Sequence, residues 1–368
     1  MKENMLIEID RKAFLFNLKQ VKNAAGGKKI FAVVKSNAYG HGAVELAREA
    51  SRFGVWGFAV SNTQEAIQLR QANLKEQILV LGASNIKDIF RDALKFNFMP
   101  TLSDFSDLDA AQKLGAALKK NLKFHLAVDT GMGRIGLWHE NVFALIDKIA
   151  DSKYLKLDGI YTHFSTADTD RKWLNKQTAD FEKIVLYARQ KGLKFIAHAA
   201  NSAAIFKDAK THFDAVRPGI CLYGLKPFEK YEKKVLLKPV LSWKTKIALI
   251  KDLPKGASVS YGRTFIAKKP LRIAVLPVGY WDGYSRALSG ISKVLINGHF
   301  AKVLGRITMN MTIVDVTNIA NAKVDDEVVL IGRQGKCKIS ADELAKLCRT
   351  IDYEFVCGIN QLFSKKYL

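Results

Sequence analysis

Short apolar runs alternate with helix-like stretches through the first two-thirds of the chain, and this alternation constrains the fold more than any other feature. Apolar strands separated by helices are typical of a parallel sheet covered on both faces. Eight such runs within about 225 residues fit a (β/α)8 barrel, whose usual length is roughly 250 residues. They are Ile30–Val34, Val55–Val60, Gln77–Gly82, Phe96–Pro100, Lys123–Asp129, Lys156–Phe164, Lys194–Ala200 and Phe213–Gly219. We therefore predict an α/β fold that begins with a TIM-type barrel.

A doubly wound sheet is the alternative fold, but no G-x-G-x-x-G motif follows the first run, which counts against its dinucleotide-binding version. After about residue 225 the strand-like runs follow one another closely, from Leu241–Ile250 onward. Asn297-Gly298 predicts a hairpin turn between two of them. A helix is expected over Ser340–Thr350, with Ser340 as its N-cap. We predict a barrel domain over residues 1–230 and a mostly-β domain over 231–368. The first strand, near residues 5–10, can pack with the second domain.

Composition excludes several classes of protein. The net charge is +23, but the lysines are scattered and no groove-reading motif accompanies them, so we expect no nucleic-acid partner. No apolar run approaches the roughly 18 residues of a membrane span. The N-terminus lacks the apolar core of a signal peptide. The four cysteines form no CxxC pair, so we expect free thiols, a cytoplasmic location and no metal site.

Two groups at predicted strand ends suggest a cofactor. Lys35 ends the first strand, where the mouth of an apolar barrel would desolvate its amine and favour the neutral nucleophile. A structural lysine whose ammonium group reaches the solvent explains this position equally well. The loops after strands seven and eight form the common phosphate site of such barrels, and they contain Ser202, Gly219 and Ile220. An amine nucleophile beside a phosphate site indicates pyridoxal phosphate.

Nine segments of the chain, in order, resemble the alanine racemase family. They are IEID (7–10), AVVKSNAYGHG (32–42), VDTGMGRIG (128–136), THFSTAD (162–168), HAANSAA (198–204), VRPGICLYG (216–224), SVSYGRTF (258–265), PVGYWDGY (277–284) and GRITMN (305–310). The resemblance covers almost the whole chain. It implies interconversion of L- and D-alanine, with D-alanine supplied for peptidoglycan.

The resemblance also implies roles for individual residues. Lys35 would carry the pyridoxal phosphate covalently and act as one acid/base, and Tyr261 of the partner subunit in a homodimer would be the other. Tyr39, Asn201, Ser202, Gly219 and Ile220 would hold the phosphate, His163 would lie beside the ring, and Arg217 would donate to the ring nitrogen. Arg134, Met309 and Tyr280 would serve the substrate, with Arg134 also near the phenolic oxygen of the cofactor and Tyr280 at the entrance.

The reaction itself demands two such groups. Racemisation removes the α-proton from one face of a planar intermediate and returns a proton on the other, so one group on each face serves either enantiomer. Lys35 and Tyr261 can each donate after accepting.

The chain departs from the family pattern at three positions. Ala127 stands where the family often has a carbamylated lysine, so Arg134 lacks that negative partner, and we expect a bound anion or a water network to replace the carbamate near Ala127. Asn310 replaces the usual aspartate after Met309, and Gln361 stands in for a phosphate-contacting tyrosine. These changes bear on cofactor affinity and rate.

Other readings stay open. A broader amino-acid racemase or a barrel decarboxylase would share the cofactor chemistry, although a decarboxylase normally carries a cysteine acid where Tyr261 stands. A non-catalytic pyridoxal-phosphate-binding protein would resemble only the barrel domain.

Overall fold

The structure, a computed structural model, describes residues 5–82, 85–228 and 235–368. It divides into two compact units: a barrel unit (residues 13–38 and 42–238) and a C-terminal unit (residues 1–12, 39–41 and 239–368). The domain boundary expected between residues 230 and 231 lies outside the described residues.

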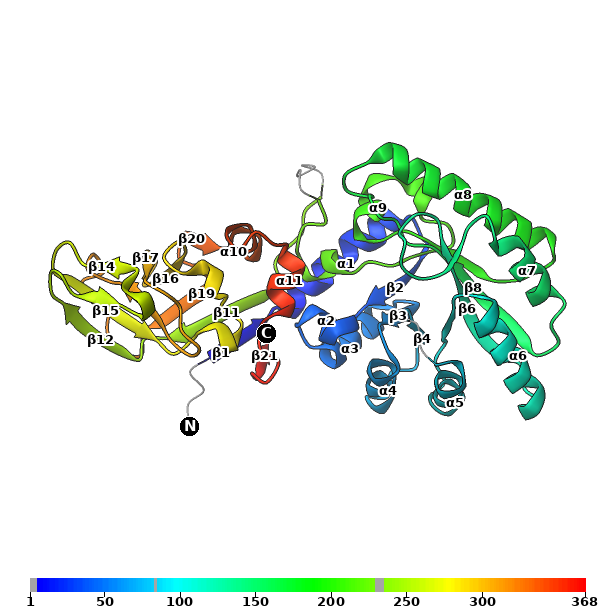
Figure 1. Cartoon of the computed structure of the whole chain (residues 1–368), viewed down its shortest axis with the longest axis horizontal. Coiled ribbons are helices and arrows are strands. Elements are labelled where there is room, and N and C mark those ends of the chain that lie inside the picture. The colour runs from blue at the N-terminus through cyan, green and yellow to red at the C-terminus, as the bar shows by residue number, and fades with distance from the viewer. Residues whose placement is uncertain (1–4, 83–84, 229–234) are drawn as a thin grey trace. The chain divides into compact units, whose positions relative to one another are not determined.

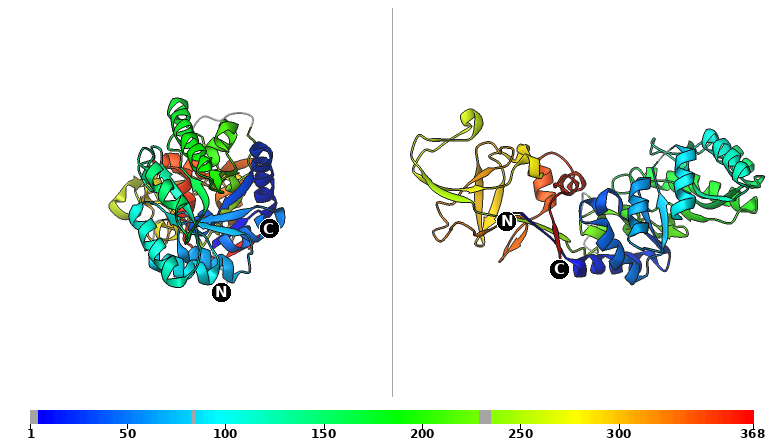
Figure 2. Two further views of the ribbon diagram at one scale, coloured as in Figure 1. Left: turned by 90° about the vertical axis from the view of Figure 1, so that its right-hand side faces the viewer. Right: turned by 90° about the horizontal axis from the view of Figure 1, so that it is seen from below.

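Eight parallel strands form a nearly closed ring in the barrel unit, in the order β4-β3-β2-β10-β9-β8-β6-β5 (Figures 1 and 2). A bridge between Leu79 and Met99 brings the two end strands together, and the Met99 N–H donates to the Ile78 carbonyl at 2.8 Å. The predicted (β/α)8 barrel is confirmed. The strands are β2 (Lys29–Val33), β3 (Gly57–Val60), β4 (Gln77–Val80), β5 (Thr101–Leu102), β6 (Leu122–Asp129), β8 (Leu155–Tyr161), β9 (Ile196–His198) and β10 (Ala215–Val216), with β7 (Leu137–Trp138) beside β6.

Helices cover the outside of these strands (Figure 1). Because the ring encloses a core and the helices cover it, strands such as β3 are buried along their whole length, which explains the continuous apolar runs. Side chains of Asn62, Asp104 and Asp170 cap the N-termini of three helices. The helices are α1 (Arg11–Ala25), α3 (Ala43–Phe53), α4 (Thr63–Gln71), α5 (Ile86–Phe96), α6 (Phe105–Leu118), α7 (Val142–Ala150), α8 (Arg171–Gln190) and α9 (Ser202–Lys207).

The fourth predicted strand, Phe96–Pro100, was wrong in its position. Phe96 ends helix α5, and Asn97 closes that helix in the left-handed conformation, with its N–H on the Ala93 carbonyl. The strand follows at Thr101–Leu102. This run therefore covers the end of helix α5 and the approach to strand β5. A run of five residues is too short to predict where one element ends and the next begins.

The C-terminal unit is mostly β, as predicted. Its main sheet has the order β12-β15-β18-β17-β16-β19-β11-β1-β21, and the N-terminal strand β1 (Met5–Ile9) pairs with β11 and β21. The other strands are β11 (Leu241–Lys246), β12 (Leu249–Leu253), β15 (Leu271–Leu276), β16 (Lys293–Ile296), β17 (His299–Leu304), β18 (Thr312–Asp315), β19 (Glu327–Gln334), β20 (Cys337–Ile339), β21 (Lys365–Tyr367) and the β13–β14 pair (Ser258–Val259 and Phe265–Ile266).

Two expectations for this unit need correction. The run Leu241–Ile250 is not one strand, because the chain leaves β11 at Ile247 and begins β12 at Leu249. The expected helix over Ser340–Thr350 is shorter: α10 spans Ala341–Leu347, and α11 (Asp352–Cys357) follows. The Ser340 side chain does accept from the Glu343 N–H, which confirms it as the N-cap.

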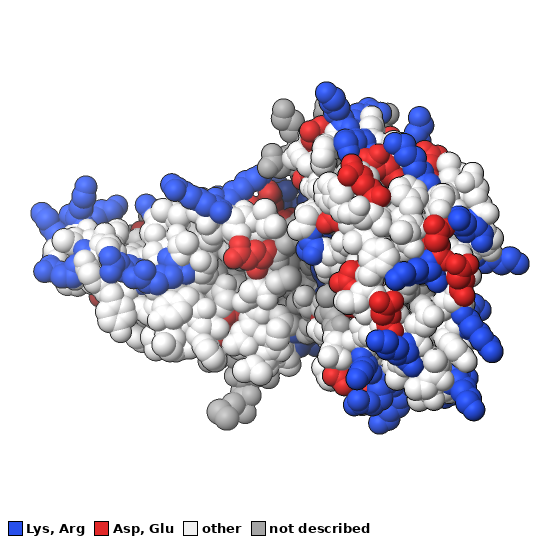
Figure 3. All heavy atoms as spheres, turned by 45° about the vertical axis from the view of Figure 1, so that its right-hand side comes forward, with Lys and Arg blue, Asp and Glu red and all other residues white. Residues whose placement is uncertain are grey.

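Charges of both signs are distributed over the barrel unit on the face seen in Figure 3, where lysine and arginine side chains lie among aspartate and glutamate. On this face the positive charges are not gathered into a single groove. No helix in the described ranges is long and apolar enough to cross a membrane.

The turn between β16 and β17 gives a stability test. Asn297 and Gly298 have φ values of 48° and 80°, as a type I′ hairpin requires. A Cβ at Gly298 would meet nothing within 4 Å, so only the backbone conformation opposes a side chain. We expect Gly298→Ala to lower the free energy of unfolding by about 1 kcal/mol, measured by urea denaturation. Asn297→Gly, the control, should change it by less than about 0.5 kcal/mol. Equal stability of Gly298→Ala and wild type would rule out this turn.

Candidate active site

Four neighbouring strands of the barrel deliver the predicted site residues to one end of the ring. Lys35 follows β2, His163 follows β8, Asn201 and Ser202 follow β9, and Arg217 follows β10. The strands lie in the order β2-β10-β9-β8 and are all parallel, so their carboxyl ends meet at the same mouth. This is the end at which barrel enzymes build their active sites.

The chain directly after Lys35 makes an unusual left-handed turn. Ser36, Asn37, Ala38 and Tyr39 have φ values of 53°, 52°, 54° and 52°. Each such residue costs roughly 1–2 kcal/mol relative to the right-handed conformation. Backbone strain of this kind is typical of functional sites. No sequence pattern at these positions predicts such a turn.

Hydrogen bonds from the barrel unit hold this turn. The Glu65 carboxylate accepts from the Ser36 N–H at 2.6 Å and from the Ser61 N–H at 2.8 Å. The Asn37 side chain accepts from the Ala43 N–H at 2.8 Å. The backbone around Lys35 is therefore fixed by groups on the neighbouring loop and on helix α3.

Arg217 is buried and held entirely by neutral acceptors. Its guanidinium donates to the carbonyls of Thr162 (2.6 Å), His198 (2.8 Å) and Ala199 (3.1 Å) and to the His198 ring at 2.6 Å. Among the described residues it forms no ion pair. Burial lowers the pKa of Arg217 to about 10, nearby Tyr161 opposes this, and the Arg134 charge adds to it. The guanidinium remains a cation at neutral pH.

Positive charge is concentrated around His163. Burial lowers the pKa of His163 well below its ordinary value, and the charges of Arg217, Arg134 and Lys35 lower it further. The Arg217 guanidinium lies 3.5 Å from the His163 ring. His163 is therefore a neutral imidazole among three cations, at a mouth suited to an anionic ligand.

The loop after β6 folds around Asp129. Its carboxylate accepts from the backbone N–H groups of Gly131 (2.8 Å), Met132 (2.9 Å) and Arg134 (2.8 Å). Burial alone would raise the pKa of Asp129, but these N–H groups and that of Gly133 together lower it. The Arg134 side chain is exposed. Water can therefore solvate its charge where the family carbamate is missing, and the anion or water network expected near Ala127 stays a prediction.

The loops after β9 and β10 are tied together at Ser202. Its hydroxyl oxygen accepts from the Gly219 N–H at 2.9 Å and from the Cys221 N–H at 3.4 Å. A hydroxyl that accepts in this way still has a proton of its own to donate. The Asn201 side chain caps helix α9 through the Ala204 N–H. Asn201 thus contributes here by shaping the loop.

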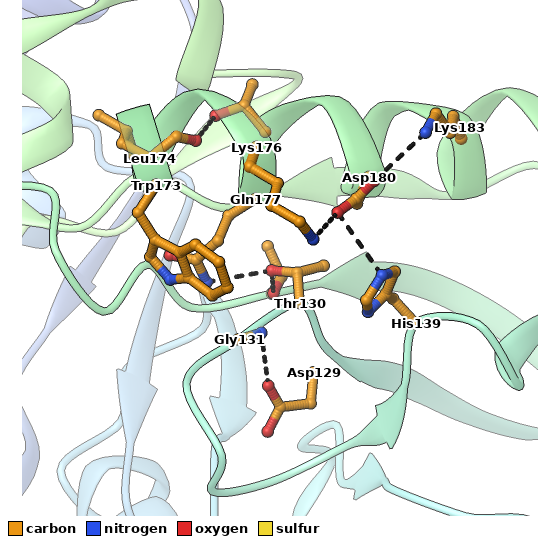
Figure 4. Close-up of polar contacts among 12 residues, drawn as sticks. Asp129, Thr130, Gly131, His139, Trp173, Leu174, Lys176, Gln177, Asp180 and Lys183 are labelled. Atoms are coloured by element: carbon orange, nitrogen blue, oxygen red, sulfur yellow. Dashed lines mark hydrogen bonds and ion pairs between the residues drawn. The ribbon is translucent and has the colours of Figure 1, made fainter. Parts of the chain in front are cut away.

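Gln177 is a residue that the sequence analysis missed. This fully buried side chain of helix α8 donates to Thr130 Oγ1 (3.2 Å) and the His163 carbonyl (3.3 Å), and accepts from the Ser165 N–H (3.1 Å) and hydroxyl (3.2 Å). Figure 4 shows Gln177 beside Thr130. Thr130 and Thr162 hydroxyls lie 2.7 Å apart. Gln177 thereby joins the loops after β6 and β8. A glutamine within an amphipathic helix carries no signal of this role.

The remaining predicted residues belong to the C-terminal unit. Tyr261 is 73% exposed and lies in a short turn in which Ser260 and Gly262 have positive φ. A Cβ at Gly262 would lie 3.0 Å from the Arg306 guanidinium. The backbone thus presents Tyr261 to the surface of this unit.

Tyr280 and Met309 are brought together. The Tyr280 N–H donates to the Thr308 carbonyl at 3.1 Å, and that of Trp281 to the Met309 carbonyl at 3.0 Å. Both side chains are exposed. Gly279 permits this approach, because a Cβ there would lie 2.2 Å from the Thr308 carbonyl.

Tyr39 and Gln361 also lie in the C-terminal unit. The Tyr39 ring lies 6.1 Å from that of Tyr353. The Gln361 amide donates to the Ile359 carbonyl at 2.7 Å and accepts from Lys365 at 3.2 Å. A Cβ on Gly40 would come within 3.2 Å of that amide. Gln361 is thus packed beside the residue that follows Tyr39.

The Gln177 network can be tested by stability. We expect Gln177→Met to lower the free energy of unfolding by about 2–4 kcal/mol, because a side chain of similar length leaves buried partners without hydrogen bonds. Gln190→Met, at an exposed position of the same helix, should change it by less than about 0.5 kcal/mol. Urea denaturation measures both. Equal stabilities of the two variants would show that Gln177 does not join the loops.

Comparison with known proteins matches this architecture throughout the chain. Residues 9–227 match the family model "Alanine racemase, N-terminal domain", and residues 240–367 match "Alanine racemase, C-terminal domain". An alanine racemase of Halothermothrix orenii is 40% identical over 363 residues, covering 98% of this chain and 96% of the relative. One of Methylacidiphilum infernorum is 41% identical over 362 residues, covering 98% and 92%. The crystal structure of alanine racemase from Bacillus anthracis with bound L-Ala-P has a TM-score of 0.93 and 34% identity, covering 100% of this chain and 96% of that chain. This chain belongs to the alanine racemase family.

Proposed function

We propose that this enzyme interconverts L- and D-alanine with pyridoxal phosphate, using Lys35 of one chain and Tyr261 of a partner chain as the two acid/bases. The observation that carries the proposal is the placement of Lys35, His163 and Arg217 after neighbouring parallel strands at the barrel mouth, with the Arg217 guanidinium 3.5 Å from the His163 ring. The guanidinium groups of Arg134 and Arg217 suit a cofactor with an anionic phosphate and phenolic oxygen and a substrate with a carboxylate.

The donor set fits the cofactor. The Lys35 amine would hold it covalently, and the Ser202 hydroxyl would donate to the phosphate beside Gly219 and Ile220. The Arg217 Nε–H, the one N–H that its four bonds to the protein leave over, would donate to the ring nitrogen. When bound, pyridoxal phosphate supplies an electron-withdrawing ring that makes the α-proton of an amino acid acidic. Arg217 is suited to the ring nitrogen because burial and neutral acceptors fix its guanidinium.

The two acid/bases divide the proton transfers. The Lys35 amine would take or return the α-proton on one face of the substrate, and the Tyr261 hydroxyl would do so on the other. Arg134 and Met309 would hold the carboxylate, with Tyr280 at the entrance. Both family models match, and this distinguishes the chain from a protein that resembles only the barrel domain.

In a homodimer with shared sites, Tyr261 of one chain would enter the active site of the other. The exposed large side chains of the C-terminal unit include Tyr261 (73%), Tyr280 (43%), Trp281 (62%), Met309 (54%) and Met311 (53%). Exposed apolar groups of this size are typical of a protein interface. Two-fold symmetry would form two identical sites from opposite units of the two chains.

The proposal extends to the setting of the reaction. All four cysteines are free thiols, in keeping with a reducing compartment, and we place the enzyme in the cytoplasm, where D-alanine is made for peptidoglycan. Alanine is the substrate that the family assignment favours, and acceptance of larger amino acids is the broader alternative.

Complementation tests catalysis across two chains. We expect Lys35→Ala and Tyr261→Phe each to lose racemase activity by roughly 100- to 10,000-fold, as expected for removal of one acid/base. In a mixed dimer, one site has both defects and the other has neither. With random exchange of subunits, about a quarter of all sites should be intact, and activity should rise far above that of either parent.

The control for complementation is a mixture of each variant with itself, treated identically. Subunit exchange is followed with a mass-labelled chain. If the chains exchange and activity does not rise, the two bases come from one chain and the shared site is wrong.

A second experiment locates the cofactor. We expect borohydride reduction of the loaded enzyme to fix pyridoxal phosphate to Lys35, because this half-buried amine lies at the mouth that holds the phosphate site. Peptide mapping by mass spectrometry identifies the modified lysine. Modification of a different lysine in the wild-type enzyme would overturn the assignment of Lys35.

A further inference from the structure

Two buried histidines extend from Arg217 into the barrel core. Arg217 Nη1 lies 2.6 Å from His198 Nδ1, and His198 Nε2 lies 2.9 Å from His125 Nδ1. His125 and His198 are fully buried. The three side chains come from β6, the end of β9 and the loop after β10, so the chain of hydrogen bonds crosses the interior of the barrel.

Hydrogen-bonding capacity fixes the protons along this chain. A guanidinium has donors only, so His198 Nδ1 must accept and the His198 proton must lie on Nε2. That Nε2–H donates to His125 Nδ1, so the His125 proton lies on its own Nε2. If His125 were protonated at both nitrogens, two donors would face each other. Both imidazoles are therefore neutral, with their accepting nitrogens directed toward Arg217.

Electrostatics agree with this arrangement. Burial lowers the pKa of His125 to about 3, with a further contribution from the Arg217 charge. Burial lowers the pKa of His198 well below its ordinary value, and Arg217 adds to it. Because Arg217 has no carboxylate partner among the described residues, the aligned imidazole dipoles help to solvate its charge. Hydrogen bonds in such a chain strengthen one another.

The backbone makes specific room for the His125 ring. The pairing of β6 with β8 shifts between Phe124 and His125, so that His125 lies opposite Gly159. A Cβ at Gly159 would lie 2.3 Å from His125 Nδ1. The His125 Nε2 atom is buried and has no hydrogen-bond partner among the described residues. The backbone thus accommodates His125 with an irregular strand pairing and a glycine, and the His125 Nε2–H is left without a partner. An apolar residue at this position would avoid the cost of that unsatisfied group.

We propose that His125 is a positioning residue for Arg217, acting through His198. By accepting from His198 Nε2–H, His125 holds the His198 ring with Nδ1 toward the guanidinium, and this fixes the direction of the Arg217 donors at the barrel mouth. The consequence for catalysis rests on the proposed function, in which Arg217 serves the cofactor ring. The hydrogen bonds between Arg217, His198 and His125 form without the cofactor, so they can be tested in the protein alone.

Two variants of His125 and one control test this role. His125→Asn offers an amide oxygen near the position of Nδ1, whereas His125→Leu offers no acceptor. His212→Leu is the matched control, because His212 is also buried in the barrel unit but bonds to the Ile205 carbonyl at 3.0 Å, outside the chain. The first readout is ¹⁵N and ¹H NMR of histidine-labelled protein without cofactor. The second is kcat and KM for alanine with pyridoxal phosphate bound.

In the wild type we expect His198 to be neutral, with a proton on Nε2 that is shifted downfield and protected from exchange. This signal should persist in His125→Asn and His212→Leu and lose its downfield shift in His125→Leu. We expect His125→Leu to lower kcat by about 10-fold with KM changed less than about 2-fold, the loss expected for one hydrogen bond in a charged network. His125→Asn should recover kcat to within about 3-fold of wild type, and His212→Leu should leave it within about 2-fold.

Several results would overturn the role of His125. They are a doubly protonated His198 in the wild type, an unchanged kcat in folded His125→Leu, and equal losses in the Asn and Leu variants. If His125→Leu does not fold, the wild-type spectrum and His125→Asn decide between the outcomes. The protein could show the expected His198 signal and yet not racemise alanine. That result would support the chain of hydrogen bonds and refute the proposed function.

Discussion

A buried guanidinium without a carboxylate is the constraint on which the site depends. Arg217 is stabilised by three backbone carbonyls and one imidazole, and each acceptor is placed by the end of a barrel strand. A buried charge is costly unless its hydrogen bonds are complete. The chain at the ends of β8 and β9 must therefore hold its carbonyls in place, and Gln177 ties the loop after β8 to the loop after β6. Because neutral groups hold it, the charge of Arg217 is not cancelled at the mouth.

The two sides of this mouth differ: one is held by buried hydrogen bonds, and the other contains strained backbone. Around Arg217, buried hydrogen bonds are dense, and no residue from 214 to 223 has a positive φ. After Lys35, four successive residues adopt the left-handed conformation, held by Glu65 and Asn37. The C-terminal unit shows the same principle at Tyr261, where positive φ at Ser260 and Gly262 presents an aromatic side chain to solvent. The proposed acid/bases thus lie at strained turns, while the groups that would orient the cofactor lie on rigid strand ends.

The barrel could be predicted because its strands are buried on both faces and read as continuous apolar runs. Positions that follow such strands, including Lys35, His163 and Arg217, could be predicted for the same reason. The left-handed turn could not, because Ser, Asn, Ala and Tyr have no composition that demands positive φ. The bonds of Gln177, His125 and His198 were also hidden, since they join segments far apart in the chain. The exposure of Arg134 could not be predicted either, because it depends on the turn that backbone N–H groups form around the Asp129 carboxylate.

The central claim, racemisation of alanine at this barrel mouth, is tested most directly by following both enantiomers. The purified enzyme, loaded with pyridoxal phosphate, is incubated separately with L-alanine and with D-alanine, and the products are separated by chiral chromatography. Because the enantiomers have equal free energies, the account predicts that both reactions converge on equal amounts of the two forms. If the loaded enzyme leaves both enantiomers unchanged, or consumes one without forming the other, the account is contradicted.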